Sequence, residues 1–313
     1  MVPRIDVARR RTKLPDFDVI GIGLAVRDIT VLLDTFPSPD EKYRAKGLFE
    51  SSGGPVPTAL VTLARLGRRV AFLGIVGDDP TGAFIIDDLG REGVDVERVV
   101  RRQYPSPSSV ILVEGGRRTI FEGWQTDLPL HRDDVLPLPG CRYLLVDARL
   151  PDVQTDAARV ARDAGGQVIL DCGHPRPGVD DLLRFTDVAI FSHTYPRAVH
   201  GEGHDLASFL EELHVKLAAD GHRIAGLTLG PEGCVIRGAD SSTVWIPGHK
   251  VATVDSTGAG DVFHGAFIHA LLANETVEVA ARFANAAAAA KCRGMTGRAP
   301  IPSEKEIRDL AGI

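Results

Sequence analysis

A glycine-rich segment near the C-terminus contains the residues whose types and spacing are best suited to chemistry. It runs Asp255-Ser256-Thr257-Gly258-Ala259-Gly260-Asp261, and Phe263, Phe267 and Leu271 follow it at helical spacing. The segment is therefore predicted to be a turn that opens a helix. The first N–H groups of a helix are unpaired and lie at the positive end of its dipole, so they can bind a phosphate group.

Asp261 lies inside that turn and has two interpretations. A first-turn acid stabilises its own helix by about 0.3–1 kcal/mol. A carboxylate held beside an anion-binding turn can also accept the proton of an attacking hydroxyl. Because phosphoryl transfer passes through a loose transition state, positioning of the base matters more than a raised pKa. We expect Asp261 to deprotonate the hydroxyl that receives a phosphoryl group.

The rest of the chain predicts the elements that position this turn. Short apolar runs, typical of parallel strands covered on both faces, alternate with helical patterns, which favours a doubly wound, mostly parallel α/β sheet. The expected strands are 17–23, 70–76, 143–147, 168–171, 188–191 and 224–228, and the expected helices are 57–66, 81–92, 154–164 and 206–219.

Two stretches interrupt the alternation and predict hairpins. They pair 29–36 with 43–50 and 108–113 with 118–121, the second across Gly115-Gly116. We expect a small β-sheet lid, inserted at about 28–52 and 106–124, that excludes water from the reaction. Such a lid exposes strand edges and apolar faces, so a homodimer formed through the lid is a further prediction.

Length and composition fit one large domain. The chain has 313 residues, 44% of them hydrophobic, and a formal net charge of −6, which gives no broad attraction for nucleic acid. Four scattered cysteines predict neither a zinc site nor a disulfide framework, and no apolar stretch predicts a membrane span. We expect a cytoplasmic protein with no nucleic-acid or membrane partner, in which a disordered basic arm over 1–16 precedes the domain at 17–313.

The 255–261 segment, extended to Phe263, resembles the C-terminal signature of the PfkB family of ribokinase-like carbohydrate kinases. Three other segments resemble family motifs in the same order: Ser52-Gly53-Gly54, Gly74 to Gly82, and Thr228 to Gly233. The resemblance covers about 17–313. It implies a ribokinase-like fold and ATP-dependent transfer of a phosphoryl group to a hydroxyl, expected to be primary, of a sugar or sugar derivative, with ATP and Mg²⁺ as cofactors.

The same resemblance implies individual site residues. Gly258, Ala259 and Gly260 would form the anion hole beside Asp261, and Asp28, Gly53 and Gly54 would contact the sugar. ATP would be bordered by Thr228, Gly230 and Gly233, with Asn285 near the adenine. Asp255 and the Thr257 carbonyl match positions that hold a monovalent cation in some members, so K⁺ is a candidate cofactor. For Gly53 and Gly54, a simple tight turn is the alternative interpretation.

The sequence departs from the family pattern at two places. Thr58 occupies a substrate-binding position that is usually Asn, and Ser192-His193-Thr194-Tyr195 replaces an Asn-x-x-Glu motif near the metal and phosphates. Magnesium binding is therefore expected to be less direct. His193 and His264 could be offered as general bases, but Asp261 already fills that role, so we expect both to be structural or surface residues.

The acceptor pocket leaves several interpretations open. Within the family the chain resembles the sulfofructose kinases, in which Lys, Asn and Arg hold a sulfonate; the matching residues are Lys42, Glu122 and Arg149. A glutamate would repel a sulfonate, so the two cations could instead pair with Glu122 and leave a pocket for a neutral sugar. Lys42 and Arg149 could also be solvated surface charges.

Three other functions remain as alternatives. A nucleoside kinase of the same fold would need an aromatic-lined pocket, and 6% of the residues are aromatic. The altered 192–195 motif is compatible with a catalytically impaired nucleotide sensor. A dinucleotide oxidoreductase is poorly supported, because Gly21-Ile22-Gly23 has two of the three fingerprint glycines, and no P-loop sequence is present.

Overall fold

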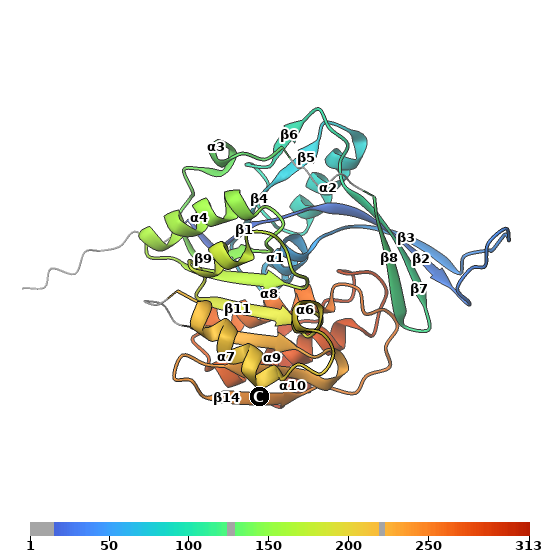
Figure 1. The fold of residues 1–313 in the computed structure, drawn as a ribbon. Helices are drawn as coiled ribbons and strands as arrows, with labels where there is room; N and C mark the ends of the chain where they lie inside the picture. The colour runs from blue at the N-terminus through green and yellow to red at the C-terminus, as the bar shows by residue number, and fades with distance from the viewer. Residues whose placement is uncertain (1–15, 124–128, 219–222) are drawn as a thin grey trace, which may run out of the picture.

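The computed structural model describes residues 16–123, 129–218 and 223–313. A central eight-stranded sheet forms the middle layer, helices lie on both of its faces, and a smaller sheet projects from one end (Figure 1). The predicted basic arm falls almost wholly outside the described residues. No helix of the described residues is long and apolar enough to span a bilayer.

The central sheet has the strand order β14-β13-β12-β11-β10-β9-β1-β4, and its six strands from β12 to β4 are parallel. β13 and β14 continue it antiparallel. The doubly wound α/β fold is thereby confirmed. The strands are β1 (Phe17–Ile22), β4 (Val70–Leu73), β9 (Cys141–Val146), β10 (Gln167–Cys172), β11 (Val188–Ser192), β12 (Ile224–Thr228), β13 (Gly233–Arg237) and β14 (Thr243–Pro247).

Alternate residues of each strand enter two hydrophobic cores, one on each face of the sheet. In β1, Val19 packs into the first core and Ile20 and Ile22 into the second. Helices α1 (Pro55–Arg65), α8 (Ala259–Leu272), α9 (Val277–Lys291) and α10 (Glu304–Ala311) cover the first face. Helices α4 (Pro151–Asp163), α5 (Val179–Leu183) and α7 (Leu206–Lys216) cover the second.

One expected strand is divided in two. The run 70–76 was predicted as a single strand, but it breaks at Gly74, where an added Cβ would lie 2.4 Å from the Phe72 ring. β4 stays in the central sheet, whereas β5 (Ile75–Gly77) pairs with β6 (Val100–Arg102). The chain continues through α2 (Pro80–Arg91), and the short α3 (Arg132–Val135) and α6 (Thr194–His200) complete the helices of the described part.

The smaller sheet is the predicted lid, with the order β3-β2-β7-β8. It comprises β2 (Val26–Leu33), β3 (Gly47–Gly53), β7 (Ser108–Glu114) and β8 (Arg117–Gly123). Both hairpins form, and a parallel β2–β7 pairing joins them, so the sheet is mixed. Successive side chains of each strand point to opposite faces of this sheet. The inner face, toward the central sheet, carries a row of three paired residues: Asp28, Ser109 and Glu122.

Candidate active site

The predicted catalytic turn does begin a helix at the carboxyl edge of the sheet. Gly258 caps α8 with a φ of 74°, and an added Cβ there would lie 2.8 Å from the Gly297 carbonyl oxygen. The first helical bond within α8 is from Val262 N to Gly258 O, at 2.9 Å, and Ala259 N donates to Ser256 O at 3.3 Å, so among the described residues the N–H groups of Gly260 and Asp261 are the ones left without a backbone acceptor. Gly260 is exposed, with no atom within 4 Å of its Cβ position. An anion can therefore approach the helix start closely.

Asp261 lies half-buried in the first turn of α8, among positive charges. Burial raises the pKa of its carboxyl group, and His264, Arg118, Arg149 and Arg298 oppose that shift. These cations come from four separate segments of the chain. The positive charges favour the carboxylate form of Asp261 against the effect of burial, and the three arginines among them can also attract phosphate oxygens.

His264 anchors the start of α8 to the sheet. Its Nδ1 lies 2.9 Å from Gly260 O and 3.2 Å from Asp171 Oδ2, and its Nε2 lies 3.1 Å from Ile190 O. Burial raises the pKa of Asp171 to about 7, and His264 opposes the shift. These contacts agree with the expectation that His264 is structural. His193 is exposed, and its backbone N–H donates to Thr228 O at 2.9 Å.

Asp255 organises the turn from below. Its side chain is fully buried, with Oδ1 accepting from Thr257 N at 2.8 Å and Oδ2 from Thr296 N at 2.9 Å. Its carbonyl accepts from Lys291 Nζ at 2.8 Å. Burial lowers the pKa of Lys291, and the Asp255 charge opposes that shift. Thr257 Oγ1 is buried and finds no hydrogen-bond partner among the described residues. Lys291 and Thr296 had no predicted role.

Asp28 and the glycine pair meet at the expected sugar site. An added Cβ at Gly53 would lie 1.8 Å from Asp28 Oδ2, and one at Gly54, where φ is 102°, would lie 2.1 Å from Leu24 O. Neither position has room for a side chain, because Asp28 and the Leu24 backbone lie against the two glycines. Burial raises the pKa of Asp28 to about 6, while Arg298 and a hydrogen bond from Ser109 oppose the shift.

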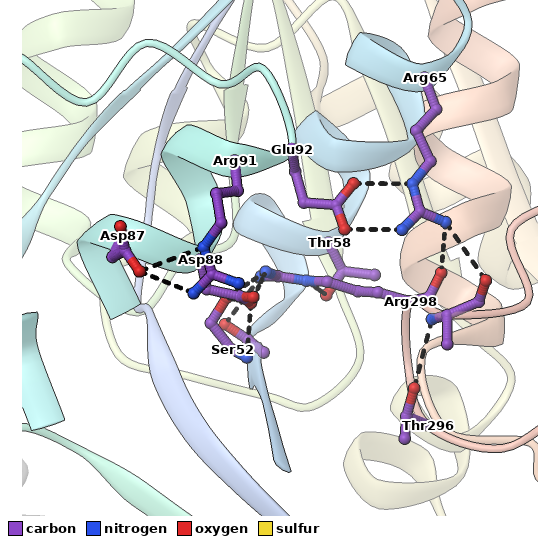
Figure 2. Close-up of polar contacts among 11 residues, drawn as sticks. Ser52, Thr58, Arg65, Asp87, Asp88, Arg91, Glu92, Thr296 and Arg298 are labelled. Carbon is purple, nitrogen blue, oxygen red and sulfur yellow. Dashed lines mark hydrogen bonds and ion pairs between the residues drawn. The ribbon is translucent and has the colours of Figure 1, made fainter. Parts of the chain in front are cut away.

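Arg298 is the main residue that sequence reasoning missed. Its side chain is 3% exposed and reaches the start of α1 and the end of β3 (Figure 2). Nε donates to Thr58 Oγ1 at 3.3 Å, Nη1 donates to Ser52 Oγ, and Nη2 donates to Gly53 O at 3.5 Å. Asp88 Oδ2 lies 3.5 Å from Nη1 and also accepts from Ser52. The Thr58 hydroxyl thus accepts a hydrogen bond from Arg298, and its predicted contact with the substrate stays a prediction.

The lid reaches the catalytic turn through two charged residues of β8. Arg118 Nη1 donates to Ser256 O at 3.1 Å and to Ser256 Oγ at 2.7 Å. Glu122 Oε1 lies 3.6 Å from Arg149 Nη2, which realises the predicted pairing of these two residues. Lys42 lies in the exposed loop 34–46, which extends away from the central sheet (Figure 1). Its role at the site stays a prediction.

The expected ATP residues surround the end of β12. Thr228 ends that strand, and Gly230, with φ 60°, opens a 3₁₀ turn over Gly230–Glu232. Gly233 has no room for a side chain, because an added Cβ would lie 2.0 Å from Ile246 O. Asn285 Nδ2 donates to Ile246 O at 3.1 Å, so Asn285 also holds the end of β14. Nucleotide contacts of these residues stay predictions.

The segment 192–195 stands where the family's metal-binding motif was expected, and its hydroxyl groups bond to one another and to the neighbouring backbone. Thr194 Oγ1 donates to Gly173 O at 2.9 Å and lies 3.0 Å from Ser192 Oγ. These hydroxyls offer no carboxylate to a metal. The expectation that Mg²⁺ is bound less directly than in other family members stays a prediction.

Sequence and structure comparisons show that this chain is similar to known carbohydrate kinases. The model of the pfkB family carbohydrate kinases matches residues 16–304. A ribokinase of Haemophilus influenzae is 26% identical over 92% of this chain and 96% of its own, and an ATP-dependent ribose-1-phosphate kinase of Halopiger xanaduensis is 27% identical over 87% and 90%. A crystal structure of Arabidopsis thaliana ribokinase with ribose and ATP covers 95% of this chain and 99% of its own, at 23% identity and a TM-score of 0.79.

Proposed function

The chain belongs to the pfkB family of carbohydrate kinases and is an ATP-dependent kinase, and from that premise we propose that it phosphorylates a primary hydroxyl of a neutral sugar. The observation that carries the proposal is the position of Asp261. It lies in the first turn of α8, beside open backbone N–H groups and within the influence of three arginines. That arrangement provides both a base and an anion hole.

The residues of the turn divide the work. Asp261 accepts the proton of the attacking hydroxyl, while the N–H groups of Gly260 and Asp261 face the charge that develops on the transferred group; the N–H of Ala259 would join them only by giving up its 3.3 Å bond to Ser256 O. Arg118 and Arg298 add positive charge from the lid and from the loop after α9. ATP with Mg²⁺ supplies the phosphoryl group, and we expect Thr228, Gly230, Gly233 and Asn285 to border it. The intact turn favours an active kinase over an impaired sensor.

The inner face of the lid supports a neutral acceptor. Asp28 and Glu122 supply carboxylates that accept hydrogen bonds from sugar hydroxyls, with Ser109 between them. The ion pair with Glu122 offsets the positive charge of Arg149, which would otherwise attract a sulfonate or phosphate. None of the proposed acceptor residues is aromatic, so stacking of a nucleobase has no support among them. A sugar therefore fits this face better than an anionic sugar or a nucleoside.

A Glu122→Gln variant tests the acceptor proposal. ATP consumption would be measured with neutral pentoses and ketohexoses, sulfonated and phosphorylated sugars, and nucleosides. We expect the wild type to prefer a neutral sugar and the variant to gain about tenfold in kcat/KM on anionic sugars, because Arg149 loses its counter-charge. Glu50→Gln is the matched control, since Glu50 pairs with Arg27 on the outer face of the lid.

Preference of the wild type for a sulfonated sugar or a nucleoside would contradict the neutral-acceptor proposal. It would leave the proposed role of Asp261 intact. Failure to consume ATP with any acceptor would instead count against the kinase proposal itself.

We also propose that two copies pair through the outer face of the lid. This face carries six apolar residues, and the edge strands β3 and β8 are open to pairing. Leu48 is 65% exposed and Phe121 is 53% exposed. The six residues are Ile29, Val31, Leu48, Val110, Leu112 and Phe121. Light scattering should show a dimer that Phe121→Ser weakens; a monomer at all working concentrations would refute the pairing.

A further inference from the structure

Lys291 is a fully buried lysine that contacts the catalytic turn. It is the last residue of α9, its exposed fraction is 0%, and its Nζ donates to the Asp255 carbonyl at 2.8 Å. The next residue pairs with the same turn, since Cys292 O accepts from Val254 N at 2.8 Å. The ammonium therefore lies between a helix C-terminus, which favours positive charge, and the segment that leads into the anion hole.

A buried ammonium needs compensating charge, and the turn provides it. The Asp255 carboxylate, also fully buried, acts on the charge of Lys291, and Asp261 adds to its effect. Without Lys291, the Asp255 carboxylate would lose a buried counter-charge, and the Asp255 carbonyl would lose a donor. A buried charge whose partner has been removed is strongly destabilising. The pair is thus a necessary part of this turn.

An added K⁺ at Asp255 and Thr257 fits this arrangement poorly. Both carboxylate oxygens of Asp255 already accept backbone N–H bonds, and its carbonyl accepts from Lys291. A second cation would face the ammonium at short range in a buried environment, where repulsion between like charges is strong. Beside the expected Thr257 carbonyl, the turn adds one buried oxygen without a partner among the described residues, Thr257 Oγ1, and these two neutral oxygens do not make a cation site.

We propose that the Lys291 ammonium is the resident cation of the catalytic turn, so that this kinase needs no added monovalent cation. The ammonium fixes the Asp255 carbonyl from the α9 side, and Arg118 holds the next carbonyl, that of Ser256, from the lid side. Together they set the backbone path into Gly258 and the anion hole. Lys291 acts here as a positioning residue, and its effect on turnover rests on the proposed kinase function.

The first test measures cation dependence at constant ionic strength, with N-methylglucamine as the inert cation. We expect wild-type turnover in K⁺ and in N-methylglucamine to agree within about twofold, and Lys291→Ala to be at least about tenfold slower in N-methylglucamine. NH₄⁺ or K⁺ should restore much of the loss by entering the vacated space. Lys216→Ala is the matched control, because Lys216 pairs with Asp180 on the surface.

The second test requires no turnover. Crystals of the wild type and of Lys291→Ala would be grown in Rb⁺, and anomalous scattering would locate bound ions. We expect a peak beside Asp255 in the variant and none there in the wild type. Thermal melting should agree, with K⁺ raising the Tm of the variant relative to N-methylglucamine and leaving that of the wild type unchanged.

Tenfold activation of the wild type by K⁺, or an Rb⁺ peak beside Asp255 in the wild type, would overturn the proposal. If Lys291→Ala does not fold, Lys291→Met keeps most of the buried stem, and the wild-type measurements decide the question without either variant. The crystallographic result stands even if no acceptor is found, so failure of the kinase proposal and failure of this one are distinguishable.

Discussion

The catalytic turn and the lid form two sides of the same site, but they are held in different ways. In the turn, Asp255 and Lys291 are fully buried, and most contacts join backbone groups to a buried charge. In the lid, every residue of β8 is exposed, and contact with the turn and the sheet edge depends on long side chains such as Arg118 and Glu122. Glu122 remains 54% exposed in its ion pair.

This difference separates chemistry from acceptor choice. A turn fixed by buried charges and a left-handed glycine tolerates little change at those positions, because a substitution of Asp255 or Lys291 leaves a buried polar group unpaired and one of Gly258 forces a clash. An exposed ion pair costs little to alter. Substitutions in the turn should therefore reduce turnover on all acceptors alike, whereas substitutions on the inner face of the lid should change which acceptor is preferred.

The largest effect is expected for Asp261→Asn. The amide cannot accept the hydroxyl proton, so kcat should fall by about 10³-fold on every acceptor. Affinity for a non-hydrolysable ATP analogue should change little, since the backbone of the turn is preserved. Steady-state kinetics and calorimetric titration measure the two quantities, with Asp240→Asn, an exposed loop acid, as control. Retained turnover would remove Asp261 from the mechanism and erase the distinction between the two regions.

The glycine-rich turn that opens α8 could be predicted from sequence because it is local. Glycines at fixed offsets from Asp261 and the helical spacing of the residues after it specify a turn that opens a helix, independent of the rest of the chain. The same holds for the alternating strands and helices of the sheet. The run 70–76 was wrongly predicted as one strand, because its second half pairs with Val100–Arg102, a partner about 25 residues away that no local pattern reveals.

The supporting cations could not be predicted, because tertiary structure pairs them. Arg298 meets Thr58 across 240 positions of the chain, and Arg118 meets Ser256 across 138. Lys291 closes an alanine-rich helix, where a lysine is normally solvated, and its complete burial follows only from the packing of α9. The Arg149–Glu122 pair was foreseen as one of several alternatives, since opposite charges at matching family positions suggested it.

The second prediction concerns Arg298, which joins the loop after α9 to the acceptor side. Arg298→Met should lower the free energy of unfolding by about 3 kcal/mol, because Ser52, Thr58 and Asp88 lose a buried donor. The acceptor KM should rise more than the KM for ATP, since the lost bonds hold the Gly53 loop. Chemical denaturation and steady-state kinetics measure these changes.

Figure 2 contains the control for this variant. Arg91 and Asp87 form an ion pair in the same neighbourhood, with 63% and 69% of their side chains exposed. Arg91→Met should leave stability and both KM values unchanged. Equal effects of the two substitutions would show that burial of Arg298 is not what makes it important.

The smallest effect is a pH dependence that separates the two regions within one enzyme. Burial raises the Asp28 pKa from 3.8 to about 6, so the stability that protonated Asp28 contributes is present below about pH 4 and lost as the pH rises through 6. Acceptor binding has the opposite sign, because only the carboxylate accepts sugar hydroxyls without restriction. From pH 7 to 5.5 the acceptor KM should rise about fourfold in the wild type and stay flat in Asp28→Asn. We expect Asp261 to govern kcat and Asp28 to govern the acceptor KM. Identical pH profiles for kcat and KM would contradict this separation of the two carboxyl groups.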